Sequence, residues 1–319
     1  MRAAVHTSFG PPDVVQVVER PIPPVRRGDV LIKVHATTVT SAECAMRRGE
    51  PWWGRVILGL RRPRAHLRTL GLEVSGTVEE VGADVTAFSP GDEVFGFTGF
   101  AVGAHADYVR LPATGSLAPK PSSSTFVEAA AAVDGATTAL FFLRDKAKLR
   151  PDQHVLINGA SGSIGTYAVQ LAKHLGATVT AVCGPSNVDL VRSLGADHVI
   201  DYTTHDFTAD VGTYDIVFDT VTKSSFRDAR RSLRTGGKYL PTTGLTNNLW
   251  ALWTLLRGGK RVLVGMSVDK RAALPLISSL LESGELRVVV DRTYPLADIA
   301  SAHRYVDAGH KRGNVVVTV

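Results

Sequence analysis

The residues best suited to chemistry are three glycines in the stretch "HVLINGASGSIGTYAVQLAKHLGA". A strand-like run, His154–Asn158, leads into a turn that carries Gly159, Gly162 and Gly165, and a helical pattern follows at once. In such a turn the first glycine permits the tight bend, the second lets the backbone approach a pyrophosphate, and the third lets helix pack on strand. The N–H groups at the amino end of the helix favour an anion. The segment therefore predicts dinucleotide binding, with a purely structural tight turn as the alternative.

The residues predicted to contact the dinucleotide lie in this turn and in the loops after the next two strands. They are Gly159, Ala160, Ser161, Gly162, Ser163, Ile164 and Gly165, followed by Cys183, Ser186, Asn187 and Tyr202. A site for NAD usually places Asp or Glu at the end of the second strand, where it binds the ribose 2′-hydroxyl. The second strand here, "TVTAVC", ends in a small neutral loop whose Ser186 and Asn187 can donate to a 2′-phosphate. We therefore expect a preference for NADPH, although no arginine is placed to clamp the phosphate.

Two other functions of the glycine turn are excluded by its residues. An ATP phosphate loop needs Gly-Lys followed by Ser or Thr, and that sequence is absent. A nucleophile elbow needs G-x-S-x-G, and here Ser163 stands where the last glycine belongs.

The chain changes character twice along its length. Its first third consists of short runs rich in Val, Ile and Phe, such as "GDVLIKVHATTV" and "DEVFGF", which predict strands. A connector with Pro119, Pro121 and three serines follows, and from about Val155 strands alternate with helices, which predicts a parallel sheet. The last fifty residues are mixed again, with a helix expected over 296–307 and a final strand "NVVVTV".

Composition is that of an ordinary soluble globular protein, with 319 residues and a net charge of +6. The densest basic cluster is spread over Arg47–Arg68, which predicts a solvated basic segment or, alternatively, a surface that attracts an anionic substrate or partner. It is not the long basic run expected for nucleic-acid binding.

The start has no apolar signal region, and "LWALWTLL" is shorter than the roughly 20 residues that span a bilayer. We expect a cytoplasmic protein without membrane insertion.

Several long motifs, in the same order, resemble the medium-chain dehydrogenase/reductase superfamily. They include "LGLEVSGTVEEVGADVTAFSPGDEVFGF", "VLINGASGSIGTYAVQLAKHLGATVTAVC" and "LVRSLGADHVIDY", and they are similar to its zinc-independent quinone oxidoreductase (zeta-crystallin-like) branch. The resemblance implies an α/β fold in which a GroES-like, partly open β-barrel catalytic domain is formed by 1–124 and the returning segment 266–319. A Rossmann NADP-binding domain with a doubly wound parallel sheet would occupy 125–265, the active site would lie in the cleft between the domains, and the protein would be a homodimer.

Metal-dependent relatives carry three zinc ligands whose places can be matched in this sequence. By that resemblance the places hold Thr40, Leu72 and Asp134. Catalytic zinc needs three protein ligands with N, S or O donors, so no metal is expected. Cys44 is then interpreted as a small core or loop residue, and the scattered histidines as surface or core residues.

Without zinc to hold an alkoxide, oxidation of an unactivated alcohol is poorly supported. Reduction of a quinone or an α,β-unsaturated carbonyl is better supported, because the enolate or phenolate charge can be carried by hydrogen-bond donors or water. The resemblance places Thr40, Glu43 and Thr137 at the catalytic cleft, with Thr137 also near the cofactor. Trp52 and Trp53 would either stack on an aromatic acceptor or cap the barrel edge. The alternatives are a metal-free alcohol or ketone oxidoreductase and a non-catalytic NADPH-binding sensor or interaction protein.

Overall fold

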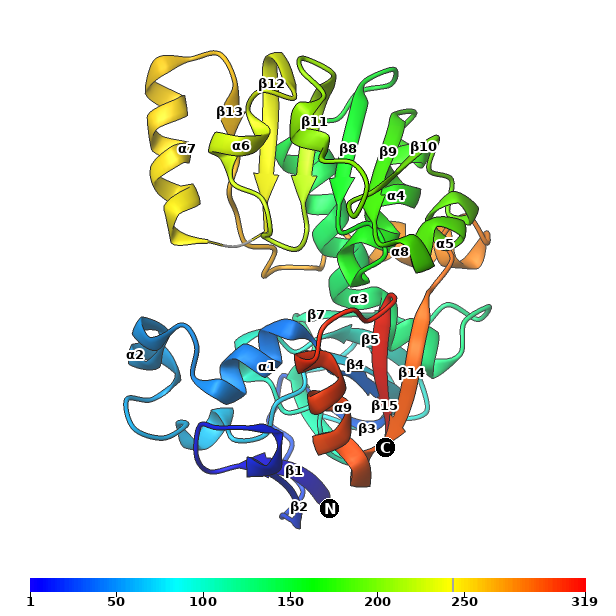
Figure 1. The fold of residues 1–319 in the computed structure, drawn as a ribbon. Coiled ribbons are helices and arrows are strands. Elements are labelled where there is room, and N and C mark those ends of the chain that lie inside the picture. Colours follow the sequence, from blue (N-terminus) through cyan, green and yellow to red (C-terminus); the bar gives the residue numbers. More distant parts are fainter. Residues whose placement is uncertain (243) are drawn as a thin grey trace. The chain divides into compact units, whose positions relative to one another are not determined.

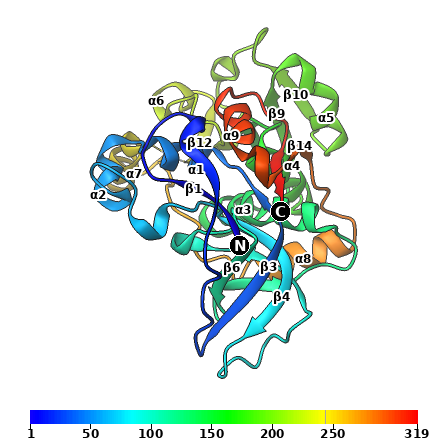
Figure 2. The ribbon, with the colours of Figure 1, turned by 90° about the horizontal axis from the view of Figure 1, so that it is seen from below.

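The computed structural model describes residues 1–242 and 244–319 and divides them into two compact units. The first unit comprises Met1–Asp134, Val268–Gly284 and Val288–Val319, and the second comprises Gly135–Ser267 and Glu285–Arg287. Both chain termini therefore belong to the first unit (Figure 2).

The boundary between the units lies at Asp134, inside helix α3 (Phe126–Leu140), and not at residue 124. The reason is packing: Ala129 and Val133, in the first half of α3, join the core cluster that contains Phe95 and Leu274 of the first unit. The proline- and serine-rich connector thus precedes the boundary instead of marking it. The second boundary follows Ser267, close to the expected return at 266.

The first unit is built on a seven-stranded, mainly antiparallel sheet with the order β14-β15-β3-β4-β5-β7, in which β6 also pairs with β3 (Figure 1). Val30, Ile32 and Val34 alternate along β3 and point into one apolar core. The last strand runs antiparallel to β3, with Val316 opposite Thr38, so the end of the chain completes this sheet. The strands are β3 (Asp29–Thr38), β4 (Glu73–Val81), β5 (Glu93–Phe97), β6 (Tyr108–Pro112), β7 (Ser116–Pro119), β14 (Val290–Pro295) and β15 (Asn314–Thr318), besides a separate pair, β1 (Arg2–His6) and β2 (Val15–Glu19).

Besides the first half of α3, four helices of the described residues lie wholly in the first unit. They are α1 (Ser41–Arg48), α2 (Arg55–Leu58), α8 (Leu274–Glu282) and α9 (Ile299–Asp307). The helix expected over 296–307 begins as a 3-10 turn, Leu296–Asp298, before α9. Cys44 of α1 packs with Ile299 and Ala302 of α9, which confirms its interpretation as a core residue.

The second unit contains the predicted parallel sheet, with strand order β10-β9-β8-β11-β12-β13. Its inner strands are buried on both faces, as the continuous apolar runs "VLI" and "IVF" predict. The strand order reverses between β8 and β11, and in open parallel sheets ligands bind outside the carboxyl ends of the strands at that point. The strands are β8 (His154–Asn158), β9 (Thr178–Cys183), β10 (His198–Asp201), β11 (Tyr214–Asp219), β12 (Leu233–Pro241) and β13 (Arg261–Val262), and the helices are α4 (Ser163–His174), α5 (Val188–Ser193), α6 (Phe226–Ala229) and α7 (Leu245–Arg257).

Helix α3 continues into a π-helical turn, Phe141–Lys146. Among the described residues this is the one helix, Phe126–Lys146, that is long and apolar enough to span a membrane by length and composition. Within its most apolar window 67% is buried inside the protein, as in a core helix.

Candidate functional site

Two of the three motif glycines are required by the fold itself. Gly159 has φ +80°, and a Cβ atom there would lie 2.4 Å from Val221 Cγ1. A Cβ atom on Gly165 would lie 2.1 Å from the carbonyl oxygen of Gly159, because α4 begins directly against the turn. Any side chain at either position would collide with its neighbours.

Gly162 is different, because the fold leaves room for a side chain there. Its φ is −80°, and a Cβ atom would meet only the Gly159 oxygen, at an ordinary 3.4 Å. Gly162 is the N-cap of α4, and no side chain caps that helix end. The backbone conformation at residue 162 does not require glycine, so the glycine serves to keep the space beside the amino end of α4 open. An open space of this kind lets a bound phosphate approach the backbone closely.

A buried polar network holds the strand ends around this turn. Asp219, at the end of β11, is fully buried and accepts hydrogen bonds from Asn158 Nδ2 (3.1 Å), the Tyr239 hydroxyl (3.0 Å) and the Ser224 amide (3.1 Å). Burial and the Asp219 carboxylate raise the pKa of Tyr239, so its hydroxyl remains a donor. The network links β8, β11 and β12 at the carboxyl edge of the sheet. The network was not predicted from the sequence, although the carboxylate that ends the apolar strand "YDIVFD" is a visible signal for it.

The predicted ribose edge is formed by the turns after β9 and β10. Cys183 is buried, burial raises the pKa of its thiol to about 11, and its carbonyl accepts from the Tyr202 amide, so its contribution here is structural. Ser186 is exposed, and the buried Asn187 Oδ1 has no hydrogen-bond partner in the described part of the chain. The Tyr202 side chain is exposed and lies against this turn, 3.2 Å from the position of a Cβ on Gly184.

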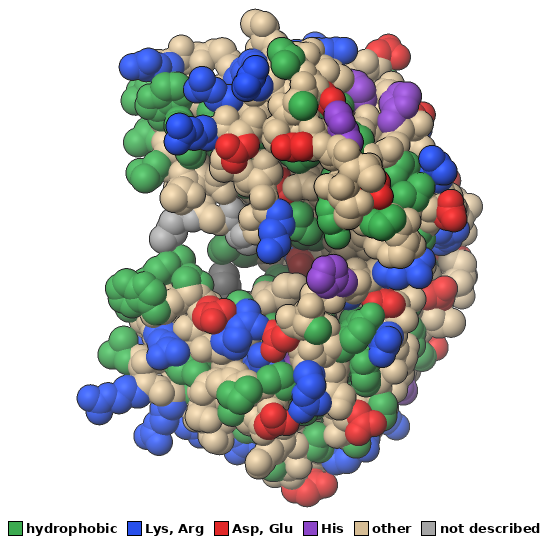
Figure 3. Space-filling model, in the orientation of Figure 1, with side chains coloured by type: hydrophobic (Ala, Val, Ile, Leu, Met, Phe, Trp, Pro, Cys, Tyr) green, Lys and Arg blue, Asp and Glu red, His purple; other side chains and the backbone are tan. Residues whose placement is uncertain are grey.

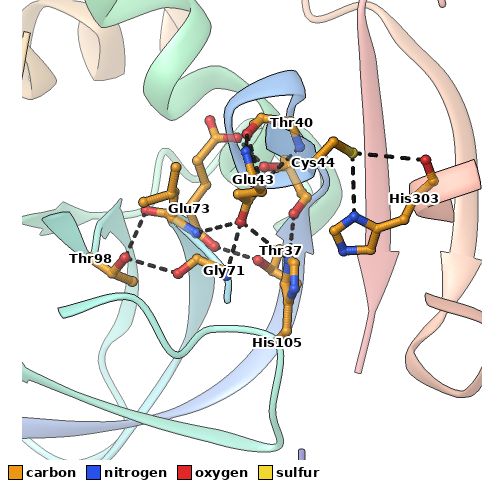
Figure 4. A network of polar contacts seen from close by, with 11 residues as sticks. Thr37, Thr40, Glu43, Cys44, Gly71, Glu73, Thr98, His105 and His303 are labelled. Carbon is orange, nitrogen blue, oxygen red and sulfur yellow. Dashed lines mark hydrogen bonds and ion pairs between the residues drawn. The ribbon is translucent and has the colours of Figure 1, made fainter. Parts of the chain in front are cut away.

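In the first unit, Thr40 and Glu43 come together as a capping box at the start of α1 (Figure 4). Glu43 Oε2 accepts from the Thr40 amide and hydroxyl, both at 2.8 Å. Its Oε1 accepts from the amides of Gly71 (2.9 Å) and Leu72 (3.0 Å). Glu43 is 0% exposed, so it holds the Thr40 turn against the Gly71–Leu72 segment instead of facing a substrate.

Thr40 and Thr137, the other two predicted catalytic residues, lie in different units of the structure. Thr40 is half-buried, and its hydroxyl both donates to Glu43 Oε2 and accepts from the Glu43 amide at 3.2 Å. Thr137 belongs to the second unit, where its side chain is buried on α3. A role for either in contact with substrate stays a prediction.

The residues at the three zinc-ligand places do not fit a zinc ion. Leu72 offers no side-chain donor, and the Asp134 carboxylate pairs with the Lys270 ammonium at 2.7 Å. Lys270 is fully buried and also lies 4.9 Å from the centre of the Phe97 ring. No group of three or more His, Cys, Asp and Glu side chains among the described residues is arranged to hold a metal. Lys270 is 136 positions from Asp134 along the chain, and no motif in the sequence predicts this pair.

Glu73, which follows Leu72, is a second buried carboxyl in this network. The Thr38 hydroxyl donates to its Oε2, and the Asp134 amide donates to its Oε1 at 2.6 Å. Burial, reinforced by the Asp134 charge, raises the pKa of Glu73 to about 8. The Glu73 carboxyl therefore holds its proton to a higher pH than an exposed glutamate does.

The buried histidines and Cys44 have structural partners. His105 Nε2 lies 2.8 Å from the Thr38 carbonyl oxygen, and Cys44 Sγ lies 3.3 Å from His303 Nδ1. Burial raises the pKa of Cys44 and lowers that of His303 to about 2. The thiol and the imidazole are both neutral, so Cys44 is not an activated nucleophile.

Trp52 and the basic segment around it lie on the surface. Trp52 is 81% exposed and Trp53 is 42% exposed, so Trp52 does not cap the barrel. Arg47 is buried and, with the half-buried Arg48, pairs with Asp307, and Arg55 and Arg68 are half-buried; Arg61, Arg62 and Arg64 are exposed.

Two family models match the chain. The alcohol dehydrogenase GroES-like domain matches residues 26–122, and the zinc-binding dehydrogenase family matches residues 194–317. These matches and the strand order of the second unit confirm the predicted fold class, a GroES-like domain with a Rossmann-type parallel sheet.

Full-length relatives extend these matches over the whole chain. The mitochondrial NAD(P)H oxidoreductase RTN4IP1 of Mus musculus is 31% identical, covering 100% of this chain and 89% of its own. The chloroplastic quinone-oxidoreductase QR1 of Triphysaria versicolor is also 31% identical, covering 99% and 98%. The structure of the quinone oxidoreductase from Coxiella burnetii superimposes with a TM-score of 0.91 at 28% identity, covering 100% and 99%.

Proposed function

The chain belongs to the medium-chain dehydrogenase/reductase superfamily, in its quinone oxidoreductase branch, and on that premise we propose that it is an NADPH-dependent, zinc-independent reductase of quinones and α,β-unsaturated carbonyls. The observation that carries the proposal is the open position at Gly162, beside an uncapped helix end at the point where the strand order reverses. That arrangement suits the pyrophosphate of a dinucleotide.

A preference for NADPH over NADH is supported by the ribose edge. Cys183 ends β9 where an NAD site usually has a carboxylate, and Ser186 and Asn187 offer neutral groups. The neighbouring carboxylate, Asp201, already accepts from the Thr203 amide (2.9 Å) and hydroxyl (2.8 Å).

For this reaction the protein must position the nicotinamide against the acceptor and stabilise the negative charge that develops on the acceptor oxygen. When bound, NADPH would supply a hydride and become NADP+; the hydride would add to the β-carbon of an enone or to a quinone, and the acceptor oxygen that becomes negatively charged would take a proton from solvent. Hydrogen-bond donors or water can carry that charge. Because Leu72 and the Lys270-paired Asp134 leave no zinc ligand set, this route suits the chain better than oxidation of simple alcohols.

The experiment follows NADPH oxidation against a panel of 1,4-quinones, enones and simple ketones, with a chelator and with NADH in parallel. We expect turnover of quinones or enones that persists in the chelator. Turnover of simple ketones alone would favour the alcohol or ketone oxidoreductase, and NADPH binding without turnover of any acceptor would favour a sensor or interaction protein.

Replacing Ser186 by Asp tests the cofactor preference. A carboxylate at the ribose edge repels a 2′-phosphate and binds a 2′-hydroxyl, so the ratio of kcat/KM for NADPH to that for NADH should fall by at least about tenfold. Ser193→Asp, on the exposed last turn of α5, is the matched control and should leave the ratio unchanged. An unchanged ratio in Ser186→Asp would place the 2′-phosphate elsewhere.

A cytoplasmic homodimer belongs to the same proposal and rests on the resemblance and the composition. Analytical ultracentrifugation tests the dimer, which a single monomeric species at micromolar concentration would contradict. Cell fractionation tests the location, and enrichment in an organelle, as in the names of the two relatives above, would contradict it.

A further inference from the structure

The loop that follows β11 brings a lysine to the edge of the parallel sheet at which the strands end. We call residues 220–225 the β11 loop. β11 is the neighbour of β8 in the sheet, and its last residue, Asp219, lies opposite Asn158 at the end of β8. The β11 loop therefore leaves the sheet beside the glycine turn, at the point where the strand order reverses and where open parallel sheets bind their ligands.

The β11 loop is in direct contact with the glycine turn. The Thr220 hydroxyl donates to the Asn158 carbonyl oxygen at 2.8 Å and lies 3.2 Å from that of Gly159. The Thr220 amide also donates to the Asn158 carbonyl, at 3.1 Å. Val221 Cγ1 lies 2.4 Å from the position of a Cβ atom on Gly159. A phosphate bound at the glycine turn would therefore lie beside the β11 loop.

The buried Asp219 carboxylate anchors the β11 loop at two places. Its Oδ1 accepts from the Val221 amide at 3.2 Å, and its Oδ2 accepts from the Ser224 amide at 3.1 Å. Asp219 is 0% exposed and belongs to the polar network at the carboxyl edge of the sheet, so this anchor is part of the core. Thr222 and Lys223 are the two residues between the anchored amides.

The backbone at Thr222 is strained. Its φ is +51°, in the left-handed region, where a β-branched residue is a conformational outlier. Strained residues persist only where their surroundings hold them, and they concentrate at binding and active sites. Here the Asp219 carboxylate holds the loop on both sides of Thr222, and the strained residue turns the chain directly before Lys223.

Lys223 carries the one basic charge in the loops at this edge of the second unit. Among the described residues, these loops are 159–162, 184–187, 202–206, 220–225, 242, 244 and 263–267, and they contain no other Lys or Arg. The Lys223 side chain is exposed and has no hydrogen-bond or ion-pair partner in the described part of the chain. On the face drawn in Figure 3, the basic side chains of the second unit gather mainly toward the opposite edge, where the strands of Figure 1 begin.

The carboxylates at this edge already have hydrogen-bond donors from the chain. They are Asp201 and Asp219 at strand ends, Asp206 in a loop and Asp228 on α6, just past the β11 loop. Each accepts from a nearby amide or hydroxyl. The positive charge of the β11 loop is therefore left for a ligand.

We infer that the ammonium group of Lys223 binds a phosphate of the dinucleotide. The amides at the amino end of α4 offer only partial positive charge, whereas NADPH carries a pyrophosphate and a 2′-phosphate. A lysine ammonium on its flexible stem binds phosphate as a point charge. Lys223 thus supplies the full positive charge that no arginine of the nucleotide loops supplies. This inference rests on the proposed function for the identity of the ligand and does not depend on turnover.

The test is titration of the full chain with NADPH by calorimetry, at low and at high salt. Lys223→Gln should raise the Kd for NADPH by about fivefold or more, because an exposed charge–charge contact is lost. Lys223→Arg keeps the charge and should stay within about twofold of the wild type. Raising the salt concentration should weaken binding by the wild type more than binding by Lys223→Gln, because salt screens the lost contact.

The matched control is Lys148→Gln, which removes the same charge from an exposed lysine in the loop that precedes β8 and should bind NADPH like the wild type. Circular dichroism establishes that each variant is folded. Titration with NADH identifies the phosphate. Equal weakening for NADH and NADPH would assign Lys223 to the pyrophosphate, and weakening for NADPH alone would assign it to the 2′-phosphate.

The outcomes separate this inference from the proposed function. Wild-type affinity of Lys223→Gln for both dinucleotides would overturn the inference and leave the reductase in place. Weaker binding by Lys223→Gln, in a protein that turns over no acceptor, would support the inference and overturn the reductase. A wild type that binds neither dinucleotide would overturn both.

Discussion

Gly162→Val is expected to abolish NADPH binding and leave the fold in place. The Cβ atom of residue 162 would have only one ordinary contact, at 3.4 Å, so the valine fits the unliganded turn. Its methyl groups would fill the space above the start of α4 and keep the phosphates from the amide groups there. Losing two charge-assisted hydrogen bonds, at about 1.5–3 kcal/mol each, weakens binding by at least about 100-fold. Titration of NADPH by calorimetry measures this, and urea unfolding should give a stability within about 1 kcal/mol of the wild type.

The neighbouring glycines provide the controls. Gly162→Ala should weaken binding less, because one methyl group leaves more of the space open. Gly165→Ala should lose stability as well as binding, because its Cβ would lie 2.1 Å from the Gly159 oxygen. If Gly162→Val bound NADPH with wild-type affinity, the dinucleotide site would not be at this turn.

The nucleotide turn could be predicted because its determinants are local. Gly159, Gly162 and Gly165 act within seven residues, and the strand before them and the helix after them are read from short patterns. The parallel sheet follows from alternation of strands and helices, and the strand order is that of the fold family. These features depend on spacing, which the sequence displays directly.

The polar networks could not be predicted, because their partners are distant along the chain. Asp219 of β11 meets Asn158 of the neighbouring strand β8, 61 positions earlier in the chain. Lys270 reaches Asp134 from a segment that returns to the first unit late in the chain. The limit of the first unit is hidden in the sequence for a related reason: Pro119 and Pro121 look like a linker, but the next helix packs its first half on the core of the first unit. Tertiary packing, not composition, decides where that unit ends.

Glu43 illustrates how burial changes the role expected of a residue. Its position in the Thr40–Glu43 turn suggested a catalytic group, but its side chain is 0% exposed and accepts four hydrogen bonds. We therefore expect Glu43→Ala to lower the free energy of unfolding by about 3–5 kcal/mol, because it leaves buried donors without an acceptor. Urea unfolding followed by circular dichroism measures the change.

Two further variants test whether Glu43 positions the Thr40 turn or acts on the substrate. Glu43→Gln keeps the shape of the side chain, but its NH2 group replaces one carboxylate oxygen and must face N–H or O–H donors there. The free energy of unfolding of this variant should therefore be about 1–3 kcal/mol lower than that of the wild type. The folded Gln variant should nevertheless retain kcat, with an unchanged pH profile and at most a modest rise in KM from movement of the Thr40 turn. Glu79→Ala, an exposed glutamate on β4, should stay within about 0.5 kcal/mol of the wild type. A Gln variant with wild-type stability and a large loss of kcat would instead mean that Glu43 acts on the substrate. A carboxylate that only positions the turn would show its loss first as a lower free energy of unfolding, and not as a lower kcat.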